Sequence, residues 1–199
     1  LKRALLLAID KSFNSLVVDG DESTNDSVFI MASGKAGNDP IVRGGEDFSA
    51  FRAALEKVCV LLVKQMAKDG EGATKFVTVT VKGAKSNPDA ARAARAIAKS
   101  PLAKTSWFGK DPNWGRVLAA VGYSGAEVVD MKATVSYDGV WAFKRGEVAD
   151  AARLSELKRV MEKDSFENMD LLTISKAADT TTSPSMRIVA PGLSSNTRH

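Results

Sequence analysis

Glu71 is the side chain of this sequence that is best placed to recognise a substrate, because a glycine stands on each side of it. Gly70 and Gly72 lack a Cβ atom, so a ligand can approach the backbone closely and meet a carboxylate at that point. A carboxylate in such a place suits recognition of an ammonium group. The residues alone also fit a plain turn with a solvated glutamate, which is the commoner situation. Both interpretations stay open at this point.

A second stretch combines the start of a helix with two unusual side chains, in the order Asp111-Pro112-Asn113-Trp114-Gly115-Arg116. Asp111 is predicted as the N-cap and Pro112 as the first helical residue, with the helix ending near Gly122. Trp114 and Arg116 then lie on the first turn, toward which the free N–H groups and the positive end of the helix dipole point. A capped helix with a tryptophan anchored in the core is the plainer interpretation of the same pattern.

The sequence is poor in the residues of the commonest catalytic sites. Its single histidine is His199, the last residue, and its single cysteine is Cys59. A Ser–His–Asp or Cys–His arrangement and a zinc site are therefore disfavoured. Cys59 lies in an apolar run and is predicted to be buried. Catalysis, if present, must use Ser, Thr, Lys, Asp, Glu and backbone groups.

Several charged residues have a structural and a functional interpretation. The acidic loop of Asp19, Asp21, Glu22 and Asp26 has almost the spacing of a calcium loop, but it lacks the central glycine and the final glutamate. We therefore expect its polar side chains, from Ser23 onward, to bond to the local backbone in Asx-type turns.

Basic residues are densest between positions 85 and 104, where a solvated face of an Ala-rich helix is favoured over a nucleic-acid patch. These residues are Lys85, Arg92, Arg95, Lys99 and Lys104. Lys104 and Lys110, near Trp107, are expected to be surface lysines whose stems lie along apolar side chains, with anion binding as the alternative.

Length and composition indicate a globular protein of ordinary type. The chain has 199 residues, of which 44% are hydrophobic and 26% charged, with a net charge of +4. No apolar run is long enough to span a bilayer, and no signal peptide is recognisable. We expect a cytoplasmic protein, or one of an organelle matrix in a eukaryote, whose true start lies upstream of Leu1.

The hydrophobic patterns predict a layered α/β fold. Helices are expected at residues 1–13, 46–68, 89–99, 111–122 and 150–163. Strands are expected at residues 16–18, 28–32, 76–82, 131–137 and 140–143, with further candidates at 169–174 and 186–190. Asp138-Gly139 predicts a two-residue hairpin turn. Residues 1–175 are expected to form one domain, and the Thr-, Ser- and Pro-containing tail 176–199 to be loosely ordered.

Five motifs stand in the same order and at the same spacing as in a known family. They are Ser12-Phe13-Asn14, the loop from Asp19 to Asp26, Glu71-Gly72-Ala73-Thr74, Ser100-Pro101-Leu102-Ala103-Lys104-Thr105, and the stretch from Asp111 to Arg116. Together they resemble the β chain of the ornithine acetyltransferase (glutamate N-acetyltransferase) family of arginine biosynthesis. The resemblance covers residues 1–125 and is weaker beyond them.

This resemblance implies a precursor that cleaves itself, so that a new N-terminal threonine of the β chain becomes the nucleophile. It implies acetyl transfer from N2-acetyl-L-ornithine to L-glutamate through an acetyl-threonine intermediate, without a metal or another cofactor. It also implies an α-β-β-α sandwich completed by a separate α chain, in an α2β2 assembly without nucleic acid or membrane. Glu71 matches the family's ornithine-binding glutamate, which favours the functional interpretation of that residue.

The sequence also departs from the family pattern. The family's nucleophile lies upstream of the region equivalent to Leu1 and its oxyanion-hole residues lie in the α chain, so we expect no catalytic residue within this chain. The tail 193–199 does not match the family's pocket-closing end, and Asn196 is not assigned that role. A degenerate homologue acting as a structural or binding protein is therefore the alternative, and a basic nucleic-acid-associated domain a weaker one. Whether acetyl-CoA also serves as a donor stays open.

Overall fold

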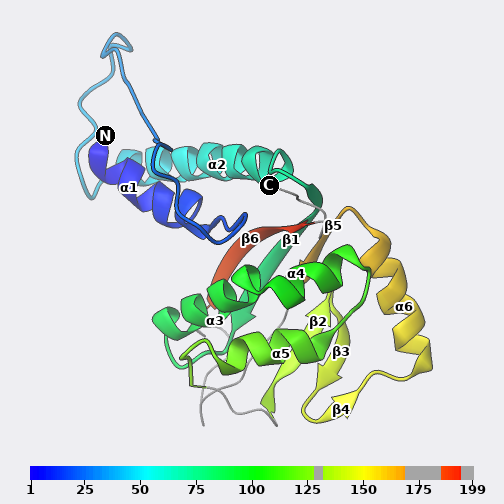
Figure 1. The fold of residues 1–199 in the computed structure, drawn as a ribbon. Coiled ribbons are helices and arrows are strands. Elements are labelled where there is room, and N and C mark those ends of the chain that lie inside the picture. The colour runs from blue at the N-terminus through cyan, green and yellow to red at the C-terminus, as the bar shows by residue number, and fades with distance from the viewer. Residues whose placement is uncertain (128–131, 169–184, 194–199) are drawn as a thin grey trace.

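The computed structural model of the chain describes residues 1–127, 132–168 and 185–193, which form one mixed sheet with helices packed against it (Figure 1). The helices of these residues are α1 (Lys2–Asp10), the 3₁₀ turn η1 (Phe13–Ser15), α2 (Glu46–Lys68), α3 (Asn87–Lys99), α4 (Pro101–Phe108), α5 (Trp114–Gly122) and α6 (Ala151–Glu162). The strands are β1 (Ala73–Lys82), β2 (Thr134–Tyr137), β3 (Val140–Lys144), β4 (Glu147–Val148), β5 (Ser165–Asn168) and β6 (Ser185–Leu193). The predicted mixed α/β class is confirmed.

The sheet has six strands in the order β4-β3-β2-β5-β1-β6. β1 runs parallel to β5 and antiparallel to β6, whereas β2, β3 and β4 are joined by antiparallel pairing. The β2–β3 hairpin turns at Asp138 and Gly139, whose φ angles of 48° and 83° are the left-handed values that a tight hairpin needs. The hairpin predicted at these two residues is confirmed.

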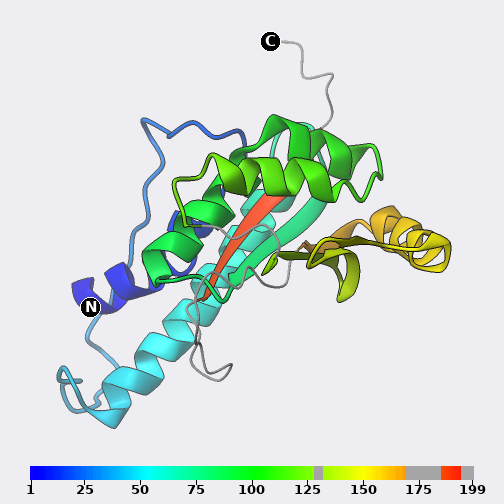
Figure 2. The same ribbon diagram turned by 90° about the horizontal axis from the view of Figure 1, so that it is seen from below.

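The core extends along the sheet, beneath the helices α3, α4 and α5 and on to α6. Val77, Val79 and Val81 alternate along β1 and are fully buried, while Phe76 and Thr78 on its other face are only half-buried. Figure 2 shows the three helices together over one face of β1 and β6. α3 turns four alanines and one isoleucine toward the strands, and these small side chains let the helix approach closely; they are Ala90, Ala93, Ala94, Ile97 and Ala98.

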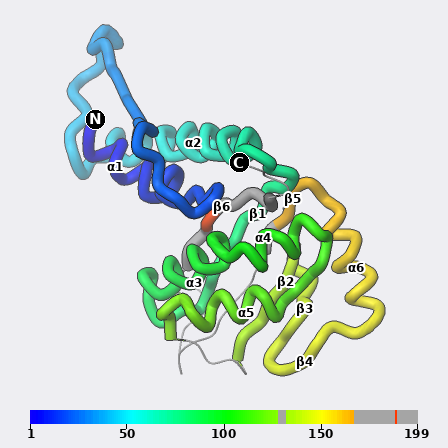
Figure 3. The backbone as a smooth tube through the Cα atoms, viewed as in Figure 1, coloured from blue at the N-terminus to red at the C-terminus, as the bar shows by residue number. Residues whose placement is uncertain are grey.

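Residues 21–45 leave the body of the protein as an extended arm beyond α1, where α1 and α2 lie side by side (Figure 3). The strand predicted at 28–32 does not form there, and Phe29 and Met31 are 83% and 92% exposed. The strand predicted at 16–18 is reduced to a single bridge residue, Leu16. Alternating apolar residues make a strand only when another strand pairs with their backbone, and the described residues offer none to the arm.

Several predicted boundaries differ from the structure. Asn113, not Asp111, caps α5, because the Asn113 side chain accepts a hydrogen bond from the N–H of Arg116 at 3.1 Å. α4 and β5 were not predicted, although Ser100 caps α4 in the standard way by accepting from the N–H of Ala103. The helices predicted at 1–13, 46–68, 89–99 and 150–163 and the strand at 76–82 are confirmed with small shifts at their ends.

The C-terminal part of the chain is described only at β6. This strand pairs with β1 from Ser185 to Leu193 and is longer than the predicted 186–190. The strand predicted at 169–174 lies outside the described residues, and the division of the chain at residue 175 stays a prediction. No helix in the described part of the chain is long and apolar enough to cross a membrane.

Candidate functional site

Glu71 lies on the turn that joins the end of α2 to the start of β1. Its side chain is exposed, and no hydrogen bond or ion pair joins it to another described residue. Gly72 has a φ of 68°, a left-handed conformation that favours glycine. The position of the Glu71 carboxylate is therefore set by the backbone of the turn and not by contacts of the side chain itself.

The turn is held by close packing at Gly70. A Cβ atom built on Gly70 would lie 3.3 Å from Cγ1 of Val18 and 3.4 Å from the carbonyl oxygen of Ala67. Glycine at this position therefore lets Val18 approach the turn. Val17, the preceding residue, is buried in the core, so the chain at this point is anchored on the protein.

Three cationic side chains from α3 and α4 bind backbone carbonyl groups of residues 14–20. Arg95 donates from Nη2 to the carbonyl oxygen of Asn14 at 2.9 Å, and Lys99 donates from Nζ to that of Gly20 at 2.8 Å. Lys104 donates from Nζ to the carbonyl oxygen of Val18. We call Arg95, Lys99 and Lys104 the cation clamp.

Lys104 is not the surface lysine that the sequence predicted, because it is only 4% exposed. Burial lowers the pKa of its ammonium to about 8, and the nearby Asp19 carboxylate offsets part of this effect. Arg92 does lie on the predicted solvated face of α3, whereas Lys85 is exposed but precedes that helix. Arg92 pairs with Asp89, and Lys85 pairs with Glu127.

Arg116 connects the Asp111–Arg116 stretch to α4. Its Nη1 donates to the carbonyl oxygen of Leu102 at 3.0 Å and to Oγ1 of Thr105 at 3.2 Å. Trp114, on the same turn, is half-buried and stacks on Phe143 of β3 with ring centroids 4.6 Å apart. The tryptophan predicted to anchor in the core thus packs against the core without being buried in it, and the stretch joins α4, α5 and the sheet.

These contacts link all five motifs of the sequence in space. Arg116 holds α4, Lys104 of α4 holds Val18, and Val18 packs on Gly70 beside Glu71. The Ser12–Asn14 motif joins through the Asn14 carbonyl and the acidic loop through the Gly20 carbonyl. Residues up to about a hundred positions apart therefore form one connected unit that includes the turn carrying Glu71.

The acidic loop folds on itself as the sequence predicted. The Asp19 carboxylate accepts from the N–H of Asp21 at 2.8 Å, and the Ser23 hydroxyl accepts from the N–H groups of Asn25 and Asp26. Within the described ranges, no group of three or more His, Cys, Asp or Glu residues is arranged to hold a metal ion.

Lys75 is a further buried cation near the site that the sequence did not single out. It lies near the start of β1, and its Nζ donates to the carbonyl oxygen of Lys163 at 2.8 Å. Burial lowers the pKa of its ammonium, and the positive charge of Lys110 lowers it further. The sequence signal for its burial was its place on the same face as Val77 and Val79, two and four residues before them on an alternating strand.

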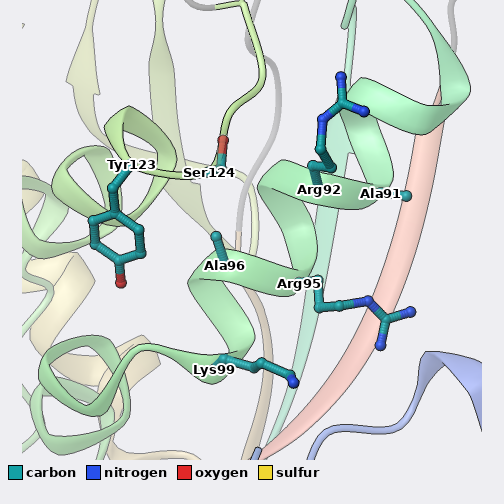
Figure 4. Close-up of a pocket in the computed structure, with 7 residues that line it drawn as sticks. All are labelled: Ala91, Arg92, Arg95, Ala96, Lys99, Tyr123 and Ser124. Carbon is teal, nitrogen blue, oxygen red and sulfur yellow. The ribbon is translucent and has the colours of Figure 1, made fainter.

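An open pocket of about 360 Å³ lies between α3 and the end of α5. Its lining includes Arg92, Arg95, Lys99, Tyr123 and Ser124. Figure 4 shows Arg95 and Lys99 pointing away from Tyr123, toward the side where the N-terminal segment runs. Because two of its three cations are engaged with backbone carbonyl groups, the pocket does not present a converging cationic site to an anion.

Comparison with protein families gives one match that covers most of the chain. The sequence model of the ArgJ family matches residues 1–183. Two curated relatives are similar over 83–86% of the chain. The arginine biosynthesis bifunctional protein ArgJ of Geobacter sulfurreducens is 49% identical over 166 residues, and the glutamate N-acetyltransferase of Methanosarcina mazei is 48% identical over 178 residues.

The fold has a close counterpart among solved structures. The crystal structure of the arginine biosynthesis bifunctional protein argJ from Bacillus halodurans matches with a TM-score of 0.89 and 34% identity, covering 98% of this chain and 88% of that one. By contrast, the chain spans only 42% and 44% of the length of the two curated relatives.

Proposed function

We propose, from the premise that the chain belongs to the ArgJ family, that it is the β-chain region of an ornithine acetyltransferase. The reaction is transfer of the acetyl group of N2-acetyl-L-ornithine to L-glutamate. Support comes from the relatives' names and from the near-complete match of residues 1–183 to the family. The observation that carries the proposal within the chain is the joining of all five motifs around Glu71.

In this mechanism the chain described here recognises substrate and does not supply the nucleophile. A threonine hydroxyl upstream of Leu1 attacks the acetyl carbonyl, the C–N bond breaks, and ornithine leaves as the amine. The α-amino group of glutamate then attacks the acetyl-threonine ester and releases the hydroxyl. No residue of this chain is assigned to either bond-making step.

Glu71 is the substrate-binding residue of this proposal. N2-acetylornithine carries a free ammonium at the end of its side chain, and an exposed carboxylate with no partner among the described residues is suited to bind it. The flanking glycines leave the approach to this carboxylate open.

The partner of the chain in this proposal is the rest of the protein, an α chain made from the same precursor. α2 carries an exposed apolar stripe at helical spacing, formed by Val58, Leu61, Leu62 and Met66. The arm adds the exposed Phe29 and Met31. Relatives are more than twice as long as the matched region, so they contain further chain that is long enough to cover these surfaces. Two such αβ pairs form the proposed α2β2 assembly.

The test is an assay for ornithine released from N2-acetylornithine in the presence of glutamate. The complete precursor, after cleavage, should catalyse this release, and residues 1–199 alone should not, because the nucleophile and the oxyanion hole lie outside them. An inactive complete precursor that cleaves and folds would instead favour the degenerate homologue. Turnover by residues 1–199 alone would show that the nucleophile has been placed wrongly.

A further inference from the structure

The cation clamp joins residues that are far apart in the sequence. Its donors lie on α3 and α4, and its acceptors are three carbonyl oxygens within the seven residues 14–20. The sequence separations are 81, 79 and 86 residues. Such long-range contacts restrict the segment more strongly than local turns do, because they tie it to helices that pack on the sheet.

Residues 16–20 have little regular structure of their own to hold them. η1 ends at Ser15, and beyond it only the single bridge at Leu16 continues the regular backbone pairing. Carbonyl groups in such a segment need other donors, and cationic side chains form the stronger, charge-assisted kind of hydrogen bond. Lys99 also packs its stem near Gly20, where an added Cβ would lie 3.8 Å from the Cγ of Lys99.

We propose that the cation clamp fixes residues 14–20 and, through Val18, positions the turn that carries Glu71. Lys104 is the central positioning residue, because it binds the carbonyl oxygen of Val18, whose side chain packs on Gly70. The inference rests on the proposed function only in assigning Glu71 to the substrate; the mechanical link between Lys104 and the turn does not depend on it.

A turn of this kind needs support from elsewhere in the fold. The Glu71 side chain has no partner among the described residues, so a shift of the turn displaces the carboxylate by the same amount. Displacements of about 1 Å at a binding group reduce enzyme efficiency by up to about a hundredfold. A buried ammonium held in one place is a rigid support, because a side chain without room to move cannot take another rotamer.

The first experiment measures the position of the turn without using activity. Hydrogen exchange of the backbone amide of Ala73, which donates to the carbonyl oxygen of Gly70 at 2.9 Å and closes the turn, is compared between the complete wild-type protein and Lys104→Met, which keeps the stem and loses the donor. We expect exchange at this amide to be faster by about tenfold or more in the variant. Lys85→Met is the matched control, because Lys85 belongs to the same basic stretch but pairs with Glu127 away from the segment.

The second experiment separates positioning from general stability. For N2-acetylornithine we expect Lys104→Met to raise KM by about tenfold and to lower kcat by less than about threefold, because it displaces a binding group and not a reacting one. Lys99→Met should have the same effect to a smaller degree. Lys99→Arg should restore most of it, since an arginine also reaches a carbonyl oxygen.

Unchanged exchange at the Ala73 amide in a folded Lys104→Met protein would overturn the proposal, as would equal effects in Lys85→Met. If Lys104→Met fails to fold, the same exchange measurement is made on Lys99→Met and Arg95→Met, because Lys99 is exposed and Arg95 half-exposed. Normal exchange in both of these variants would overturn the proposal. A wild-type protein without transferase activity would refute the proposed function. The exchange experiment would still test whether the cation clamp positions the turn, because it does not depend on activity.

Discussion

Gly70 and Val18 are in contact across the base of the turn that carries Glu71, with only 3.3 Å between Cγ1 of Val18 and the place where a Cβ of residue 70 would stand. Real Cβ atoms rarely approach other atoms this closely. Glycine at position 70 therefore lets Val18 pack closely on the turn, and the contact joins the segment between the Ser12–Asn14 motif and the acidic loop to the turn that carries Glu71.

Gly70→Ala should push Val18 and the turn apart. We expect a loss of about 1 kcal/mol in the free energy of unfolding from overpacking, together with a raised KM for N2-acetylornithine. Gly122→Ala is the matched control, because nothing lies within 4 Å of an added Cβ there and Gly122 is helical. That variant should be neutral or slightly stabilising. Equal stability and kinetics in the two variants would show that the Val18 contact is unimportant.

The capping of α5 distinguishes the structure from the sequence-based expectation. Asn113→Ala removes the acceptor for the N–H of Arg116 and should lower the free energy of unfolding by about 1 kcal/mol. Asp111→Ala removes only an exposed hydrogen bond to the Asn113 side chain and should cost clearly less. Urea unfolding of both variants of the complete protein checks the order, and a larger loss in Asp111→Ala would restore Asp111 as the cap.

Sequence patterns correctly predicted the elements whose formation depends mainly on residues close together in the sequence. The alternation of β1, the period of α2 and α6 and the Asp138-Gly139 turn each follow from neighbouring residues, and each is present. Two good capping residues compete at 111 and 113, and composition alone cannot choose between them. The strand predicted at 28–32 failed for a different reason, since a strand needs a partner that no local pattern supplies.

The sequence indicated Glu71 as a binding residue, but it did not indicate the side chains that position it. Glu71 was recognisable from its glycines and from the family resemblance. Lys104 looked like one more solvated cation, because its burial depends on Val18, which is 86 residues away in the sequence. A hydrogen bond from a side chain to a backbone carbonyl leaves no signature in the sequence of the acceptor, so the clamp is visible only in the structure.

The exposed apolar stripe of α2 and the arm have a consequence for the isolated chain. Without its partner, residues 1–199 should bind a hydrophobic dye strongly and aggregate, and both effects should fall when the α chain is present. Replacing Phe29 and Met31 by serine should reduce dye binding by the isolated chain, because these two side chains are the most exposed large apolar groups described. A soluble monomer that unfolds cooperatively and binds no dye would contradict the proposed partner.

Lys104 should leave a pH signature on stability. Its pKa is about 8 in the folded protein against an ordinary value of 10.5, so between these values the unfolded chain binds more protons than the folded one. The cost of burying its charge is fully present below pH 8 and is relieved as the pH rises toward 10.5. The difference in urea midpoint between wild type and Lys104→Met should therefore shift in favour of wild type from pH 8 to pH 10. A difference that stays constant over this range would mean that Lys104 remains charged.

Glu71→Gln gives the most direct test of substrate recognition. The change keeps the size of the side chain and removes its charge, so it weakens a charge-assisted contact to the substrate ammonium that contributes about 1.5–3 kcal/mol. If the contact is made in the transition state, kcat/KM for N2-acetylornithine falls about 10- to 150-fold. The melting temperature should not change, because the side chain is exposed and has no partner among the described residues.

The neighbouring Asp69 supplies the control for this experiment, since it is an exposed carboxylate at the end of α2, two residues from Glu71. Asp69→Asn removes the same charge from the same turn, so any loss due to the general electrostatic potential should appear in both variants. Only a loss confined to Glu71→Gln indicates a direct contact with the substrate. Normal kinetics in Glu71→Gln would make Glu71 a solvated turn residue, and the joined motifs around it would then have a purely structural purpose.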